Sequence, residues 1–263
     1  MSTVKDVFDF LNGLYPVSMK MDFDNVGHLA GDSRDVVKKI IVSLDVTGEV
    51  ISEAEKEGAN LIISHHPLFF SLKSVTDLDP VGRNVCRLIR SGISAICMHT
   101  NLDAAEGGVN DALAKATGIK EPELLCVEGT DEKGKPYCIG RMGELEKEMP
   151  MNEYLLMIKK ALGTAGLRYY DSGRPVKKVG VVGGSGMSQI QYALDSGCDT
   201  FLTADIKYNG FLDAREFGYN VIDADHFCTE NLIVPVLAEK LRERFEDIEV
   251  PVSQVHCQTV KFI

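Results

Sequence analysis

The sequence predicts an α/β fold made of mixed or parallel sheets flanked by helices, arranged in two halves. Apolar, β-branched runs of strand length alternate with segments of helical spacing over residues 39–99 and again over residues 179–245. Strand, helix and strand at this spacing indicate parallel strands joined by right-handed crossovers. The 263 residues suffice for one large domain or two smaller lobes, each with a substantial core.

The first half opens with a helix and continues as a strand–helix–strand unit. Residues 4–13 have helical apolar spacing. A strand is predicted at 39–46 and a helix at 47–58, whose first turn Thr47 or Asp45 can cap. Two further elements complete this half, a helix at 82–91 and a strand at 93–99.

Two adjacent histidines follow the predicted strand at 61–64. Pro67 cannot donate to a β-ladder, so His65 and His66 lie in the loop past the strand's carboxyl end. Ligands of open α/β sheets bind at that edge. Neighbouring side chains of an extended chain point to opposite sides, so the two imidazoles can serve two ions lying side by side. The simpler alternative is a pair of polar loop residues, and only further ligands would favour the metal interpretation.

An acidic residue occupies the corresponding place after the strand at 93–99. Thr100 to Asp103 follow this strand, and a new helix starts after Gly108. Asp103 is therefore a candidate ligand, although a strand-end aspartate is often only a helix cap. His99, still on the strand, is predicted to be a hydrogen-bonded interior histidine. Upstream, Asp22 and Asp24 could bind a cation, but we interpret them as solvated turn residues.

The periodicity loosens between the two halves. We predict a first lobe at 1–125, a connecting segment or small lobe at 126–177, and a second half at 178–263. The middle segment has a hairpin-like turn and one amphipathic helix, predicted at 129–136 and 151–162.

The second half repeats the strand-and-helix alternation. A strand at 179–182 enters a glycine-rich loop at 183–186, which lacks both the Lys-Ser/Thr ending of a nucleotide P-loop and the dinucleotide spacing. A tight strand-to-helix turn is the default interpretation. The remaining elements are a helix at 188–196, strands at 198–205 and 220–225, a helix from 226 to about 245, and a final strand at 250–263.

His226 and Glu230 open the last helix, four positions apart, so they share one helical face. They can meet one metal centre, or they form a plain surface i,i+4 pair. Ligand-type side chains thus follow several strands: His65, His66, Asp103, His226 and Glu230. Imidazole with carboxylate suits zinc, manganese, iron or nickel. Five protein ligands exceed what one catalytic zinc needs. Two divalent ions about 3.5–4 Å apart fit better and can activate a water between them.

Four runs carry these candidates in a fixed order. They are Ile63-Ser64-His65-His66-Pro67-Leu68-Phe69-Phe70, His99-Thr100-Asn101-Leu102-Asp103, Thr203-Ala204-Asp205-Ile206-Lys207-Tyr208 and Asp223-Ala224-Asp225-His226-Phe227-Cys228-Thr229-Glu230. Together they resemble the type 2 GTP cyclohydrolase I homologue family, also called the Nif-three-like family. The resemblance covers most of residues 1–125 and 178–263.

This resemblance implies a two-lobed α/β fold, a dinuclear metal site and a ring-shaped homohexamer whose sites face an inner cavity. It implies that Glu230 bridges the two ions, and it assigns the metal ligands to His65, His66, Asp103, His226 and Glu230. Phe23 stands where a tryptophan is common, Asn209 stands where a histidine is common, and the tail at 258–263 matches loosely. These departures concern substrate contacts and leave every ligand in place.

Two functions of different classes follow. The first is a dinuclear metal-dependent hydrolase, GTP cyclohydrolase-like or acting on another nucleotide or phosphoester as its small-molecule substrate. Side chains around the metals or the substrate would then be Asp45, Thr100, Asp205 and Lys207. The alternative is a non-catalytic metal-binding hexameric scaffold or interaction protein.

The composition limits the classes of binding partner and the cellular compartment that we expect. The chain has 28 Lys and Arg against 39 Asp and Glu and no dense basic run, which argues against direct nucleic-acid or anionic-membrane binding. The N-terminus lacks signal-peptide order and no apolar stretch has membrane-spanning length, so we expect a cytoplasmic protein. The seven cysteines are scattered without a C-x-x-C and are predicted to be buried reduced thiols.

Overall fold

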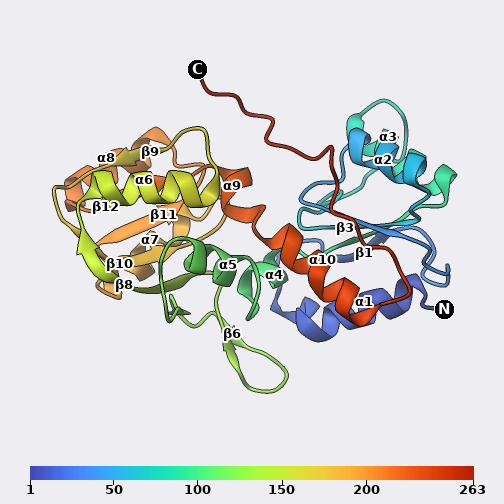
Figure 1. Cartoon of the computed structure of the whole chain (residues 1–263), viewed down its shortest axis with the longest axis horizontal. Helices are drawn as coiled ribbons and strands as arrows, with labels where there is room; N and C mark the ends of the chain where they lie inside the picture. Colours follow the sequence, from blue (N-terminus) through green and yellow to red (C-terminus); the bar gives the residue numbers. More distant parts are fainter. The chain divides into compact units, whose positions relative to one another are not determined.

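Two β-sheets organise the chain, one in each of two compact units (Figure 1). The computed structural model describes all residues, 1–263. The first unit comprises Met1–Leu102 with Ile233–Cys257, and the second comprises Asp103–Leu232 with Gln258–Ile263. Both sheets are flanked by helices, which confirms the predicted mixed α/β class. The predicted boundaries at residues 125 and 177 both fall inside the second unit.

The first unit contains a four-stranded sheet in the order β1-β4-β3-β2. Its strands are β1 (Gly27–Ala30), β2 (Ile40–Ser43), β3 (Leu61–Ser64) and β4 (Ser94–Cys97). β2, β3 and β4 run parallel, as the crossover spacing predicts, and β1 is antiparallel to β4. All residues of the three parallel strands are buried, which explains why they are apolar without alternation.

Helix caps explain where the helices of the first unit begin and end. α2 (Gly48–Glu57) starts at Thr47, whose hydroxyl accepts from the Val50 amide, and stops at left-handed Gly58. α3 (Pro80–Ser91) begins after the Asp79 cap and ends at left-handed Gly92. The other helices of this unit are α1 (Val4–Leu14), η1 (Val17–Met19) and α10 (Ile233–Arg244).

The predicted final strand at 250–263 is wrong. Only Glu249 and Val252 form isolated bridges, to Lys39 and Val42 beside β2. Pro251 lies between them and has no amide hydrogen to donate, so no continuous ladder forms.

The second unit contains a six-stranded sheet in the order β5-β8-β10-β11-β12-β9. The central strands β10, β11 and β12 are parallel, and β8 and β9 pair with them in antiparallel fashion. The strands are β5 (Glu123–Leu124), β8 (Arg141–Met149), β9 (Arg168–Tyr170), β10 (Val176–Val181), β11 (Thr200–Thr203) and β12 (Asn220–Asp223). A separate hairpin is formed by β6 (Gly129–Thr130) and β7 (Pro136–Tyr137).

Residues 126–177 are integral to this second sheet. They supply β8, β9 and α6 (Met151–Leu162), whose Tyr154 and Ile158 pack in one cluster with Val179 and Leu202. β8 is largely polar because much of it is solvent-exposed, and this hides its strand character in the sequence. The other helices are α5 (Val109–Ala116), η2 (Met187–Gln189), α7 (Ile190–Asp195), α8 (Tyr208–Phe217) and α9 (His226–Glu230), with α4 (Thr100–Ala104) at the boundary of the units.

Candidate metal centre

The loop after β3 holds both predicted histidines in fixed positions. The His66 amide donates to the Leu44 carbonyl at 2.9 Å, and Ser64 Oγ donates to the His66 carbonyl at 2.8 Å. His65 is fully buried, and its Nδ1 lies 3.0 Å from the Met98 carbonyl oxygen. Since a carbonyl oxygen only accepts, Nδ1 carries a proton, and in the neutral ring Nε2 is then the acceptor nitrogen.

Asp45 orients the second ring. Its Oδ1 lies 2.7 Å from His66 Nδ1, a carboxylate–imidazole contact that fixes the orientation of the ring. Thr47, rather than Asp45, caps α2. The sequence predicts Asp45 around the metals or the substrate, and in the structure its carboxylate contacts the imidazole of His66, a predicted ligand.

His99 joins these two rings. Ring nitrogens of His65, His66 and His99 all lie within 4.8 Å of one another, and we call these residues the imidazole group. His99 is hydrogen-bonded, as predicted, with Nδ1 at 2.9 Å from Asp24 Oδ1. It also belongs to a group that could hold a metal ion, which the sequence interpretation missed because β4 ends at Cys97, before this residue.

Asp24 is not the solvated turn residue that the sequence suggested. Its side chain is fully buried and accepts from the Thr100 amide at 3.0 Å and from the Thr100 hydroxyl. Burial acts to raise the pKa of Asp24, but hydrogen bonds from His99 and Thr100 and the charge of His99 outweigh it, so this pKa lies well below its ordinary value. Its partners are 75 and 76 positions away, so no local pattern separates Asp24 from exposed Asp22.

Two exposed aromatic rings adjoin the imidazole group. The rings of Phe23 and Phe70 are 6.1 Å apart, and Phe70 lies 5.8 Å from the His99 ring. Phe23 is 63% exposed and Phe70 is 55% exposed, so the two rings in contact form a small exposed apolar surface. The Asn25 amide donates to the Phe69 carbonyl at 2.8 Å and ties the two supporting loops together. We call Phe23 and Phe70 the phenylalanine pair.

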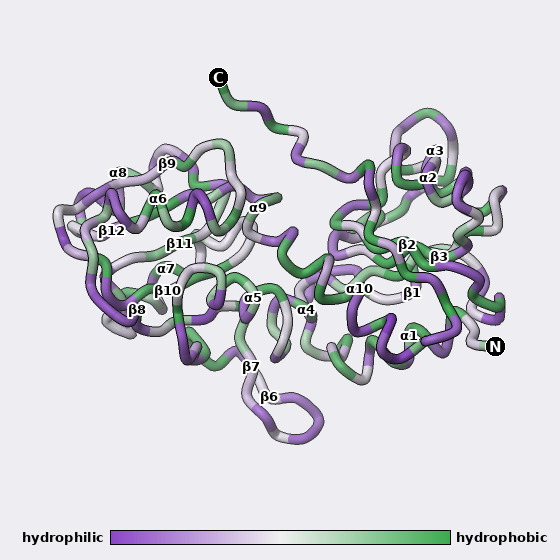
Figure 2. The backbone as a smooth tube through the Cα atoms, viewed as in Figure 1, coloured by the Kyte–Doolittle hydropathy of each residue, from purple (hydrophilic) through white to green (hydrophobic).

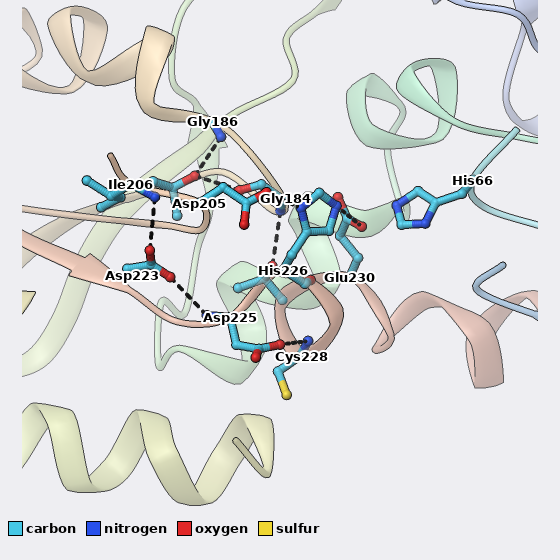
Figure 3. Close-up of polar contacts among 12 residues, drawn as sticks. His66, Gly184, Gly186, Asp205, Ile206, Asp223, Asp225, His226, Cys228 and Glu230 are labelled. Carbon is cyan, nitrogen blue, oxygen red and sulfur yellow. Dashed lines mark hydrogen bonds and ion pairs between the residues drawn. The ribbon is translucent and has the colours of Figure 1, made fainter. Parts of the chain in front are cut away.

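The second unit carries a group of its own at the start of α9. His226 Nε2 lies 3.0 Å from Glu230 Oε2, and His226 Nδ1 lies 2.7 Å from Asp205 Oδ2 (Figure 3). The shared helical face predicted for His226 and Glu230 is thus realised. A neutral imidazole has one N–H, so two contacts with carboxyl groups require a further proton on one of the partners or a cation beside Nε2.

The loop before α9 is strained. Asp225 has φ 71° and ψ 128°, an uncommon conformation for a residue with a side chain, and its carboxylate accepts from the Cys228 amide at 3.0 Å. Asp223, at the end of β12, accepts from the amides of Ile206 and Asp225 at 2.9 and 3.3 Å. One carboxylate therefore fixes both loops that carry Asp205 and His226.

Asp103 lies on the short helix α4 rather than in a loop, and it is buried. A carboxylate oxygen of Asp103 lies within 4.8 Å of one of Glu230. Asn110 donates to the Asp103 carbonyl at 3.1 Å and accepts from the Gly183 amide at 2.8 Å. We call Asp103, His226 and Glu230 the carboxylate group.

The glycine-rich loop after β10 packs closely against the Glu230 side chain. A Cβ on Gly184 would lie 2.0 Å from Glu230 Oε1 and 3.2 Å from His226 Nε2. Gly184 also has φ +61°, a left-handed conformation that favours glycine. The loop is the tight turn that the sequence predicts. Because its glycines have no side chains, the loop leaves room for His226 and Glu230.

Thr100 and Lys207, the other two residues predicted around the metals or the substrate, differ in their surroundings. Thr100 supports His99 indirectly, through Asp24. Lys207 immediately precedes α8 and is exposed, and it takes no part in the contacts described above.

The donors fit a divalent transition metal. Imidazole nitrogens and carboxylate oxygens form both groups, and such donors suit zinc, manganese and iron. Each imidazole is anchored through Nδ1, the usual arrangement of histidines that bind metal through Nε2. The Gly184 cradle beside Glu230 adds the space that a ligand carboxylate needs.

No helix of the structure has the length and apolar character needed to cross a membrane. The chain is similar to known proteins along its whole length. It is 36% identical over 263 residues to a Clostridium perfringens protein named GTP cyclohydrolase 1 type 2 homolog, with 99% of each chain covered. A Clostridium acetobutylicum protein of the same name is 35% identical over 240 residues, covering 90% of this chain and 89% of that one.

Solved structures agree with these sequence relatives. The Staphylococcus aureus hypothetical protein SA1388 superposes with a TM-score of 0.93 at 30% identity, with 99% of both chains covered. A Bacillus cereus protein related to NIF3 superposes with a TM-score of 0.92, covering 100% of this chain and 99% of that one. The model of the Duf34/NIF3 (NGG1p interacting factor 3) family matches residues 2–259, and the chain therefore belongs to this family.

Proposed function

We propose that this protein is a metal-dependent hydrolase in which two divalent ions are held by His65, His66, Asp103, His226 and Glu230. The observation that carries the proposal is the anchoring of each of these imidazoles through Nδ1, to the Met98 carbonyl, Asp45 or Asp205. Histidines that bind a metal through Nε2 are usually anchored in this way, and the anchor raises the basicity of Nε2. Zinc, manganese or iron would suit these donors.

Two such ions would activate a water molecule and stabilise negative charge on the attacked group. The chain's own residues prepare the site for this chemistry. Asp45 and Asp205 orient His66 and His226, and Gly184 leaves the space that Glu230 occupies. Glu230 would bridge the ions, as the family resemblance implies, and its proximity to both Asp103 and His226 supports this role.

The phenylalanine pair supports a substrate with a planar ring. Phe23 and Phe70 are exposed, in contact with each other, and adjoin His99. Aromatic side chains stack on the faces of nucleobases without regard to their identity. A nucleotide or a related small molecule fits this surface, and the name of the clostridial relatives, GTP cyclohydrolase 1 type 2 homolog, is consistent with one. A phosphoester without a base would use the ions alone.

The test combines metal content with turnover. Protein purified without chelator should contain bound metal by elemental analysis, and it should hydrolyse GTP, another nucleotide or a generic phosphoester when manganese or zinc is supplied. Asp103→Ala should lose metal and turnover while retaining the circular dichroism of the wild type. Asp213→Ala, an exposed aspartate on α8, is the matched control and should keep both.

Metal-loaded protein that is inert towards the nucleotide and phosphoester panel would overturn the hydrolase proposal and favour the scaffold function. The family resemblance also implies a homohexameric ring, which is part of the proposal. Light scattering of the wild type and of Asp103→Ala tests it separately from activity, because a scaffold would assemble without turning over substrate.

A further inference from the structure

Two cysteines meet at the base of the β6–β7 hairpin in the second unit. Cys126 follows β5 and Cys138 follows β7, twelve positions apart, and their Sγ atoms are 3.0 Å from each other. A disulfide bond is about 2.05 Å long, so a shift of roughly an ångström separates these thiols from a covalent bond. Cys138 is fully buried, whereas Cys126 is partly exposed.

The surroundings favour a dithiol over a metal site. A carboxylate oxygen of Glu128 lies within 4.8 Å of both sulfurs, which on composition alone could suggest a metal site. However, Glu128 Oε2 accepts from the Ile139 amide at 2.8 Å and Oε1 accepts from Gln189 at 3.2 Å. Burial, the contact with Cys138 and the charge of Glu128 all raise the pKa of the Cys126 thiol. A protonated thiol is a poor metal ligand.

We propose that Cys126 and Cys138 form a disulfide when the protein meets a hydroperoxide, which makes the base of the hairpin a site of reversible oxidative modification. The proposal is independent of the metal centre.

The chemistry needs no further reactant. Cys126, the more exposed thiol, attacks the outer oxygen of the hydroperoxide as thiolate, which gives a sulfenic acid and releases the alcohol, or water from hydrogen peroxide. Cys138 then attacks the sulfenic sulfur, forms the S–S bond and expels water. Two electrons pass from the sulfurs to the peroxide, and both thiol protons leave with its oxygens. The raised pKa of Cys126 makes the first step slow near neutral pH.

The disulfide would stabilise the attachment of the short edge strand β5 to the sheet. β5 is a strand of two residues, Glu123 and Leu124, that pairs with β8, and the chain then leaves the sheet for the hairpin (Figure 1). The hairpin tip at residues 131–135 is hydrophilic and exposed over most of its length (Figure 2). A disulfide between the two strands of the base would keep β5 and the start of β8 together when the tip is cut or opens.

The experiment uses the full-length reduced protein. After treatment with hydrogen peroxide and alkylation of the remaining thiols, trypsin cuts after exposed Lys133, between the two cysteines. We expect a pair of peptides joined through Cys126 and Cys138 that dithiothreitol separates, and an intact mass lower by the mass of two hydrogen atoms. The same treatment of urea-unfolded protein should give a mixture of pairings.

Cys126→Ser and Cys138→Ser should each abolish the cross-linked peptide pair, and Cys257→Ser, at an exposed cysteine outside the hairpin, should leave it intact. Native protein that yields the same mixture as unfolded protein, or only sulfenic and sulfinic acids on single cysteines, overturns the proposal. Stoichiometric zinc that protects both thiols and is lost in Cys126→Ser would overturn it in favour of a metal site.

Discussion

Asp205 holds the Nδ1 atom of His226 at 2.7 Å, although the two residues are 21 positions apart in the chain. Asp205 has a left-handed backbone, with φ 54°, and its side chain is more than half exposed. Asparagine tolerates this conformation, so the carboxylate can be replaced without disturbing the loop.

Asp205→Asn should therefore weaken metal binding about 10- to 100-fold, because the imidazole loses the acceptor that orients it and raises its basicity. Competition against a zinc-chelating dye measures this change, with Asp213→Asn as the exposed control on α8. If the variant binds metal with the affinity of the wild type, Asp205 does not contribute to metal binding.

Gly184→Ala should destabilise the second unit and remove metal together. Alanine costs about 1–2 kcal/mol in a left-handed backbone, and its Cβ would also displace the Glu230 carboxylate. Gly218→Ala is a matched control, since Gly218 has the same φ of +61° with nothing within 4 Å. Urea unfolding and elemental analysis separate the two effects. If both variants lose equal stability and both keep metal, the space at Gly184 is not needed for metal binding by Glu230.

Asp24→Asn should lower the free energy of unfolding at pH 7 by about 1–3 kcal/mol, because a buried carboxylate that binds Thr100 and His99 loses its charge. The pKa of Asp24 is depressed in the folded protein, so its stabilisation is complete above the unfolded pKa of about 4 and declines as the pH falls towards the folded pKa. The difference between wild type and variant should shrink from pH 7 to pH 3 in chemical denaturation. Exposed Asp22→Asn should show neither effect.

Phe23→Ala and Phe70→Ala should raise the KM of a nucleotide substrate about 10-fold, since stacking contributes about 1–3 kcal/mol per base, and should leave a phosphoester without a ring almost unaffected. Phe217, 61% exposed on α8, provides the matched control for loss of an exposed ring. Steady-state kinetics on both substrates make the comparison. An equal loss on the two substrates would indicate a structural role for the phenylalanine pair.

The parallel strands and capped helices were predictable because their signals are local. Thr47, Asp79 and the left-handed glycines after α2 and α3 mark helix ends within a few residues. The metal-ligand candidates were likewise marked by their position after strands. Asp24 was not, because only folding brings it to Thr100, and β8 was hidden because a half-exposed antiparallel strand carries many polar residues.

The return of the chain to β2 has a practical consequence for dissecting this protein. Residues 249–252 lie along β2, and α10 packs against the same strand, yet both are encoded after the whole second unit. An N-terminal fragment that stops at Leu102 would carry β2 with bare amides and carbonyls, which is a template for aggregation. Isolation of the first unit therefore requires a linker that rejoins Leu102 to Ile233.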